Sequence, residues 1–76
     1  MTPHYTLDPR EVDALVATLA PRQELVYRLA LRGLCDRCRG DRVFEQRTEE
    51  LMLGFGRDLS AVLAEAAQLS RKLTER

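Results

Sequence analysis

The chain has 76 residues, 45% of them hydrophobic and 32% charged, and its twelve basic and twelve acidic side chains cancel at pH 7. Balanced charge excludes a global attraction to nucleic acid or to anionic membranes. No stretch approaches the roughly 20 apolar residues of a membrane span. A chain this short can bury only a small core, so regular helix packing or self-association must stabilise it. We therefore expect one soluble, cytoplasmic, all-α domain over residues 1–76.

The first helix is predicted over residues 9–20, after a flexible tail at 1–7. The run Asp8-Pro9-Arg10-Glu11 is typical of a helix start, because it supplies an N-cap acceptor, a proline at the first position and a glutamate for a capping box. Pro21 disfavours helical geometry at the residue before it and can open a second helix itself. One face of the first helix carries the apolar residues Val12, Leu15, Val16 and Leu19.

The second helix is predicted over residues 22–38, and it is apolar around most of its circumference. Such a helix is normally covered on several sides. In so short a chain, we expect the extra cover to come from a second molecule. The residues of this helix that we expect at the interface are Leu25, Tyr27, Leu31 and Leu34.

The third helix is predicted over residues 42–74, after Gly40 and Asp41, which suit the end of one helix and the N-cap of the next. Gly54 and Gly56 within it indicate either close backbone packing, which we favour, or a kink. Its apolar seam is expected to pack on the second helix, so the fold class is a short N-terminal helix plus a long antiparallel helical hairpin, forming a helical-bundle homodimer. The seam consists of Met52, Phe55, Leu59, Val62, Ala66, Leu69 and Leu73.

Cys35 and Cys38 form a CxxC motif, which is the only motif with evident chemical potential. Two thiols at i and i+3 can share a metal or oxidise together, but a structural zinc needs four ligands and one motif supplies two. Metal binding at Cys35 and Cys38, redox chemistry and ordinary packed thiols all remain open, and zinc is the cofactor that a metal site would take. His4 is the one histidine, and the sequence suggests no catalytic partner for it.

The composition and motifs favour a small non-enzymatic interaction module that acts as a homodimer and binds another protein, as an adaptor, a chaperone or an inhibitor. Phe55, Leu59 and Val62 of the seam complete the expected interface. One alternative is a zinc- or redox-linked regulator that joins Cys35 and Cys38 across a dimer. A second alternative, nucleic-acid binding, depends on a local arginine excess and is disfavoured by the absence of a recognition element. That excess comprises Arg28, Arg32, Arg37, Arg39 and Arg42.

Overall fold

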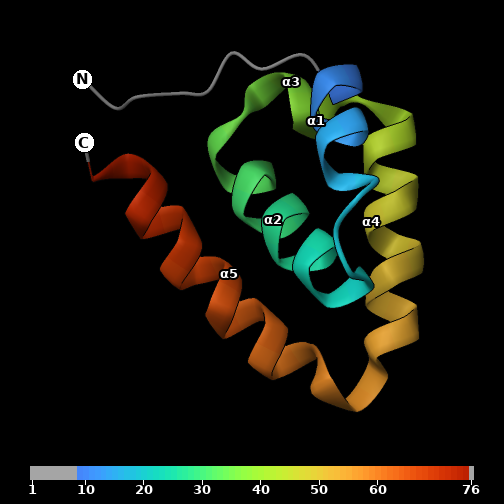
Figure 1. The fold of residues 1–76 in the computed structure, drawn as a ribbon, viewed down its shortest axis with the longest axis vertical. Coiled ribbons are helices and arrows are strands. Elements are labelled where there is room, and N and C mark those ends of the chain that lie inside the picture. The colour runs from blue at the N-terminus through green and yellow to red at the C-terminus, as the bar shows by residue number, and fades with distance from the viewer. Residues whose placement is uncertain (1–8, 76) are drawn as a thin grey trace.

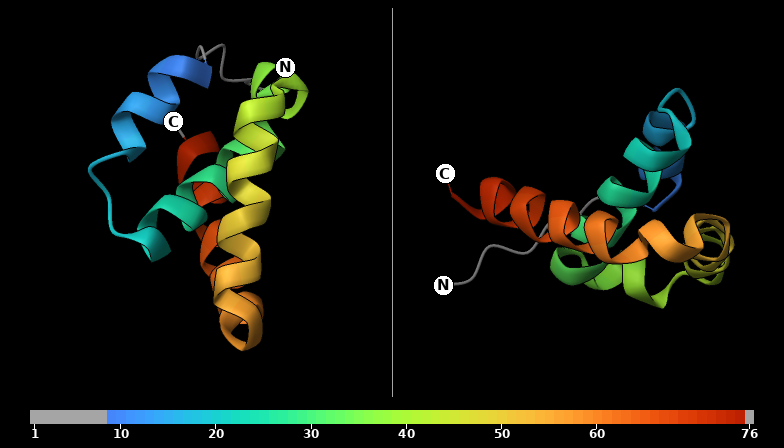
Figure 2. Two further views of the ribbon diagram at one scale, coloured as in Figure 1. Left: turned by 90° about the vertical axis from the view of Figure 1, so that its right-hand side faces the viewer. Right: turned by 90° about the horizontal axis from the view of Figure 1, so that it is seen from below.

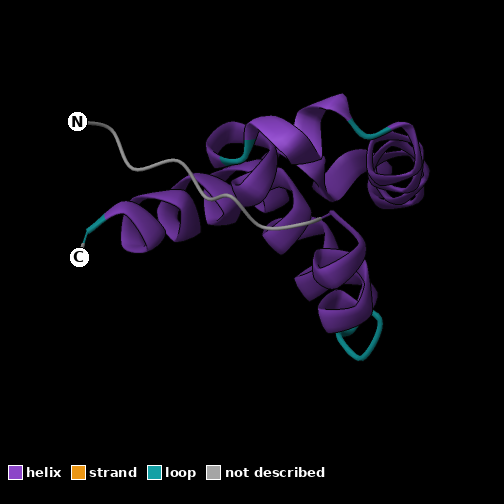
Figure 3. Cartoon of the chain, turned by 90° about the horizontal axis from the view of Figure 1, so that it is seen from above, coloured by secondary structure: helices purple, strands orange, loops and turns teal. Residues whose placement is uncertain are grey.

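The computed structural model describes residues 9–75, and within them the chain forms helices and loops without a strand (Figure 3). The all-α class predicted from the sequence is therefore confirmed. The predicted tail at 1–7 and His4 lie outside the described residues. In order, the elements are α1 (Pro9–Val16), α2 (Pro21–Leu34), α3 (Asp36–Gly40), α4 (Arg42–Phe55), the 3-10 turn η1 (Gly56–Asp58) and α5 (Leu59–Thr74).

Helix α1 is shorter than the predicted helix over 9–20. Its last turn tightens after Val16, where the amide of Leu19 donates to the Val16 carbonyl at 2.9 Å and the Thr18 hydroxyl donates to the Leu15 carbonyl at 3.1 Å. Ala20 is then extended, with φ −62° and ψ 150°, as expected for a residue before proline. The chain can therefore turn at residues 17–20 and start α2 at Pro21.

Helix α2 ends at Leu34, so the prediction of one helix over 22–38 is wrong. Cys35 has extended backbone angles, φ −114° and ψ 111°, and its sulfur accepts a hydrogen bond from the Cys38 amide at 3.4 Å. A side-chain acceptor at an N-cap satisfies an amide that the new helix leaves unpaired. The break at Cys35 thus opens the short helix α3 and turns both cysteines inward.

Helix α4 begins where the sequence predicts it, because the Asp41 carboxylate caps it by accepting from the Phe44 amide at 2.9 Å. The predicted helix over 42–74 is nevertheless divided in two. Gly56 has φ 38° and ψ −106°, a conformation that only glycine adopts readily. A Cβ added at Gly54 or Gly56 would meet no atom within 4 Å, so our preference for close packing at these glycines is wrong. Gly56 instead makes the turn between α4 and α5.

Helix α2 lies at the centre of the molecule, between α4 and α5, which diverge from the turn at Gly56 (Figures 1 and 2). One face of α2 packs on the α4–α5 side through a cluster built on Leu25, Leu51 and Val62. The other face joins α1, α3 and α4 in a second cluster. That second cluster consists of Val12, Val16, Leu31, Cys35, Cys38 and Phe44. A central helix with two apolar faces explains why α2 is apolar around so much of its circumference.

Candidate functional site

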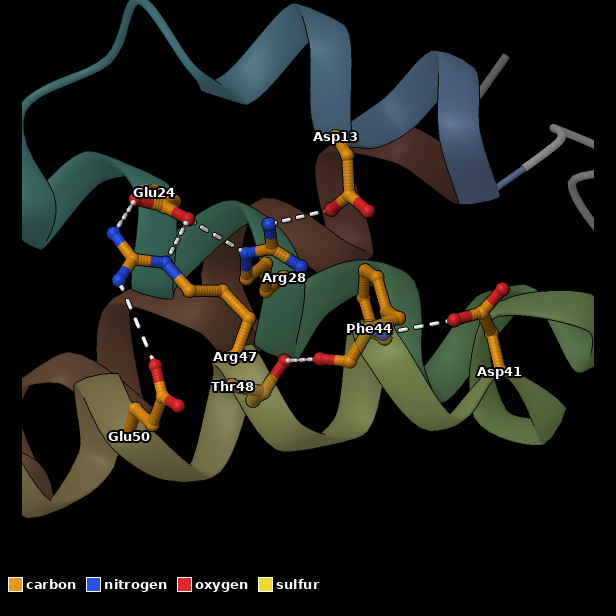
Figure 4. Close-up of polar contacts among 8 residues, drawn as sticks. All are labelled: Asp13, Glu24, Arg28, Asp41, Phe44, Arg47, Thr48 and Glu50. Atoms are coloured by element: carbon orange, nitrogen blue, oxygen red, sulfur yellow. Dashed lines mark hydrogen bonds and ion pairs between the residues drawn. The ribbon is translucent and has the colours of Figure 1, made fainter.

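A partly buried network of charged side chains connects α1, α2 and α4 (Figure 4). Glu24 and Arg28 lie one turn apart on α2, and they are only 5% and 3% exposed. Glu24 accepts from Arg28 Nε and from Arg47 Nε and Nη2, each at 2.9 Å. Arg28 also donates to Asp13 of α1 at 2.5 Å. The network therefore links three helices through two guanidinium groups and two carboxylates.

Arg28 is the centre of this network, and its surroundings are both polar and aromatic. Its guanidinium carbon lies 5.0 Å from the centre of the Phe44 ring, a distance at which a cation is attracted to the ring face. Nη1 of Arg28 is buried and has no hydrogen-bond partner among the described residues. The Arg47 hydrogen bonds, reinforced by Arg28, hold the pKa of Glu24 below its ordinary value of 4.5, although burial acts in the opposite direction. The network keeps Glu24 ionised inside the molecule.

Cys35 and Cys38 are fully buried, and neither is in a disulfide. Burial, followed by the hydrogen bond to the Cys35 side chain, raises the pKa of Cys38 to about 12. Within residues 9–75 no three His, Cys, Asp or Glu side chains gather as a metal would require. The predicted zinc site would therefore need donors beyond those described. Two buried thiols also cannot meet a second pair across a dimer unless α1, α3 or α4 moves.

The predicted interface residues divide into two groups. Leu25, Leu31, Leu34 and Val62 are buried within the chain's own core. The structure corrects this part of the prediction, because a side chain without accessible surface cannot contact a partner. Tyr27, Phe55 and Leu59 are half-buried at the edges of the two clusters and keep some accessible surface. The far face of α2, which we expected a second molecule to cover, is covered by α1, α3 and α4.

A different apolar surface lies where α4 and α5 meet. Met52, Leu53 and Leu59, together with Glu49, line an open hollow of about 320 Å³, and we call these four residues the elbow surface. Leu53 is 83% exposed, and Leu63, one turn beyond Leu59, is 45% exposed. Sequence reasoning missed Leu53, because it lies outside the 4-3 seam. One feature of the sequence could have identified it. Leu53 follows Glu49 and Glu50 by four and three residues, so it is an apolar residue on the charged face of the predicted helix.

None of the helices within residues 9–75 is long and apolar enough to cross a bilayer. Of the five arginines that carried the nucleic-acid alternative, three lie in ion pairs: Arg28 with Glu24 and Asp13, Arg32 with Glu45, and Arg39 with Asp36. Much of the local positive charge is thereby neutralised within the chain. Comparison of the chain with protein-family models, curated proteins and solved structures finds no match.

Proposed function

We propose that the chain is a non-enzymatic helical interaction module, which acts as a homodimer and binds a partner protein as an adaptor, a chaperone or an inhibitor. The observation that carries the proposal is the exposure of Leu53 on the elbow surface. Burying a leucine side chain is worth roughly 1.5–3 kcal/mol, and Leu53 has the most exposed large apolar side chain in the part of the chain that the structure describes. It is therefore the strongest anchor available for a contact.

A second copy of the chain suits the elbow surface. Leu53 protrudes beside the hollow that it helps to line with Met52 and Leu59. A two-fold axis places the same patch of both subunits in contact. A patch that carries both a projection and a hollow is then self-complementary, because the projection of each subunit meets the hollow of the other. In such a dimer, Leu53 of each copy would fill the hollow of the other. The partner protein would then bind elsewhere, with Tyr27 and Phe55 as remaining half-buried contacts.

The charged residues also favour an interaction module over an enzyme. Glu24, Arg28, Arg47 and Asp13 are engaged with one another across three helices. Such pairs fix the relative positions of helices, whereas acid–base catalysis requires groups directed toward a substrate. The zinc alternative lacks a third donor among the described residues, and the nucleic-acid alternative loses part of its arginine excess to internal ion pairs.

Light scattering on the purified chain tests the proposal. We expect twice the chain mass of 8.7 kDa for the natural sequence and a single chain mass for Leu53→Glu, because a charge cannot be buried in the apolar hollow without a partner. Val43→Glu is the matched control. Val43 is 66% exposed on the same helix but lies ten residues, or about 15 Å, from Leu53. A monomeric natural chain at micromolar concentration, or equal dissociation of both variants, would contradict the proposal.

A further inference from the structure

The two cysteines are placed for a reaction that the proposed function does not use. Cys35 has left the helical conformation, so its sulfur lies 3.4 Å from the backbone nitrogen of Cys38. Both side chains are fully buried in the same cluster. A disulfide requires Cβ atoms about 3.5–4.5 Å apart and sulfur atoms about 2.05 Å apart. The Cβ of Cys38 is two bonds from the nitrogen that Cys35 Sγ contacts, so the two side chains start from neighbouring positions.

Helix α1 covers this pair of thiols. Val12 and Val16 belong to the same buried cluster as Cys35 and Cys38, and Asp13 is held to Arg28 of α2. Helix α1 has only eight residues and is joined to α2 through the short connection at 17–20. A dissolved oxidant cannot reach a fully buried sulfur, so the thiols become accessible only when the structure opens locally. A short helix on a loop is the kind of unit that opens in this way.

We propose that Cys35 and Cys38 are an intrachain redox couple gated by α1, and that hydrogen peroxide converts them to a disulfide when α1 moves away. In the first step, the sulfur of one cysteine attacks a peroxide oxygen, the O–O bond breaks, and a sulfenic acid and water form. In the second step, the other sulfur displaces the hydroxyl group, the S–S bond forms and a second water leaves. Two thiols are thereby oxidised, and one peroxide is reduced to two waters.

Intact-mass analysis of the reduced, full-length chain tests the reaction itself. After treatment with peroxide and then N-ethylmaleimide, we expect a mass loss of about 2 Da and no maleimide adduct. Cys38→Ser should instead gain about 16 Da as a sulfenic acid at Cys35, which dimedone traps. A disulfide between two chains, or a sulfinic acid in the natural sequence before any intrachain disulfide, would overturn the proposal.

The gate is tested by the rate of the same reaction in two variants of α1. Val16→Ala removes part of the apolar contact that holds α1 against the buried cluster. We expect oxidation to become at least about tenfold faster, because α1 is then displaced in a larger fraction of the molecules. Leu15→Ala, on the exposed side of α1, should stay within about twofold of the natural rate. If circular dichroism shows that Val16→Ala does not fold, Asp13→Asn replaces it with the same expectation. Equal rates in the natural chain, the control and the gate variants would show that α1 does not control access.

Discussion

At the residue scale, Glu24 is a buried charged side chain that depends on its hydrogen-bond partners. It is an ionised carboxylate that is 5% exposed, and it accepts three hydrogen bonds from two arginines. Burying a charge is unfavourable unless the charge is paired and hydrogen-bonded. Arg28 depends on Glu24 in return, because one of its nitrogens already has no partner among the described residues. The spacing of Glu24 and Arg28 at i and i+4 is visible in the sequence, but their burial is not.

We expect Glu24→Gln to lower the free energy of unfolding by roughly 2–4 kcal/mol, because it leaves the buried Arg28 with less negative charge nearby. Urea denaturation measures this as a lower midpoint with an unchanged slope. Glu50→Gln is the control. The Glu50 carboxylate lies 3.9 Å from Arg47, and both side chains are exposed, so the change should stay within about 0.5 kcal/mol. Equal effects of the two substitutions would contradict the role given to the network.

The same carboxylate gives a prediction for acid. Because the hydrogen bonds from Arg47 and Arg28 lower the folded-state pKa of Glu24 below 4.5, the unfolded chain takes up a proton first as the pH falls. Stability from Glu24 is therefore complete above about pH 5 and is lost below it. In urea titrations from pH 7 to pH 3, the natural chain should lose more stability than Glu24→Gln, so that the two curves converge. Parallel curves over this range would show that Glu24 has no lowered pKa.

At the element scale, the two glycines between α4 and α5 have opposite roles. Gly54 is inside α4 with ordinary helical geometry, whereas Gly56 has a positive φ of 38°. Sequence alone suggests a helix breaker in this region but does not say which glycine makes the turn, or whether there is a turn at all. That choice depends on the fold, because α5 must reverse direction to cover α2.

Alanine substitutions should separate these roles. Gly56→Ala should lower the free energy of unfolding by about 1–3 kcal/mol, since an L-residue is strained at this φ. Gly54→Ala should raise it by about 0.5–1 kcal/mol, because alanine is the better helix former and no neighbouring atom lies within 4 Å of the added Cβ. Thermal or urea denaturation distinguishes the two signs. Destabilisation by both substitutions would favour close packing at the pair.

At the scale of the whole molecule, the chain is compact without a partner. Its radius of gyration is 11.7 Å, close to the roughly 11 Å expected for a folded chain of this length. The apolar surface that we expected a second molecule to cover is largely covered by α1, α3 and α4. The apolar surface that remains exposed for association is the elbow surface with Leu53. A test of the dimer therefore changes Leu53.

If the dimer is part of the folded state, its stability must depend on protein concentration. We expect a tenfold increase in concentration to raise the thermal midpoint by roughly 3–5 °C in the natural chain, because mass action favours the associated form. Leu53→Glu should show a midpoint that is independent of concentration. Differential scanning fluorimetry over a hundredfold concentration range measures both. A constant midpoint in the natural chain would mean that folding does not require the second copy.

The sequence by itself determined the helical class, the start of α4 at its Asp41 cap and the phase of the apolar seam, because these features depend on residues that are neighbours along the chain. Only the tertiary structure decided that Cys35 leaves the helix, that Gly56 reverses the chain and that α1 covers the thiols. Periodicity identifies which residues are apolar, but it does not identify the segment that buries them. Leu31 and Leu53 illustrate the difference, since both are apolar residues on long helices. Leu31 is buried in the cluster that α2 forms with α1, α3 and α4, whereas Leu53 stays exposed at the hollow where α4 and α5 meet.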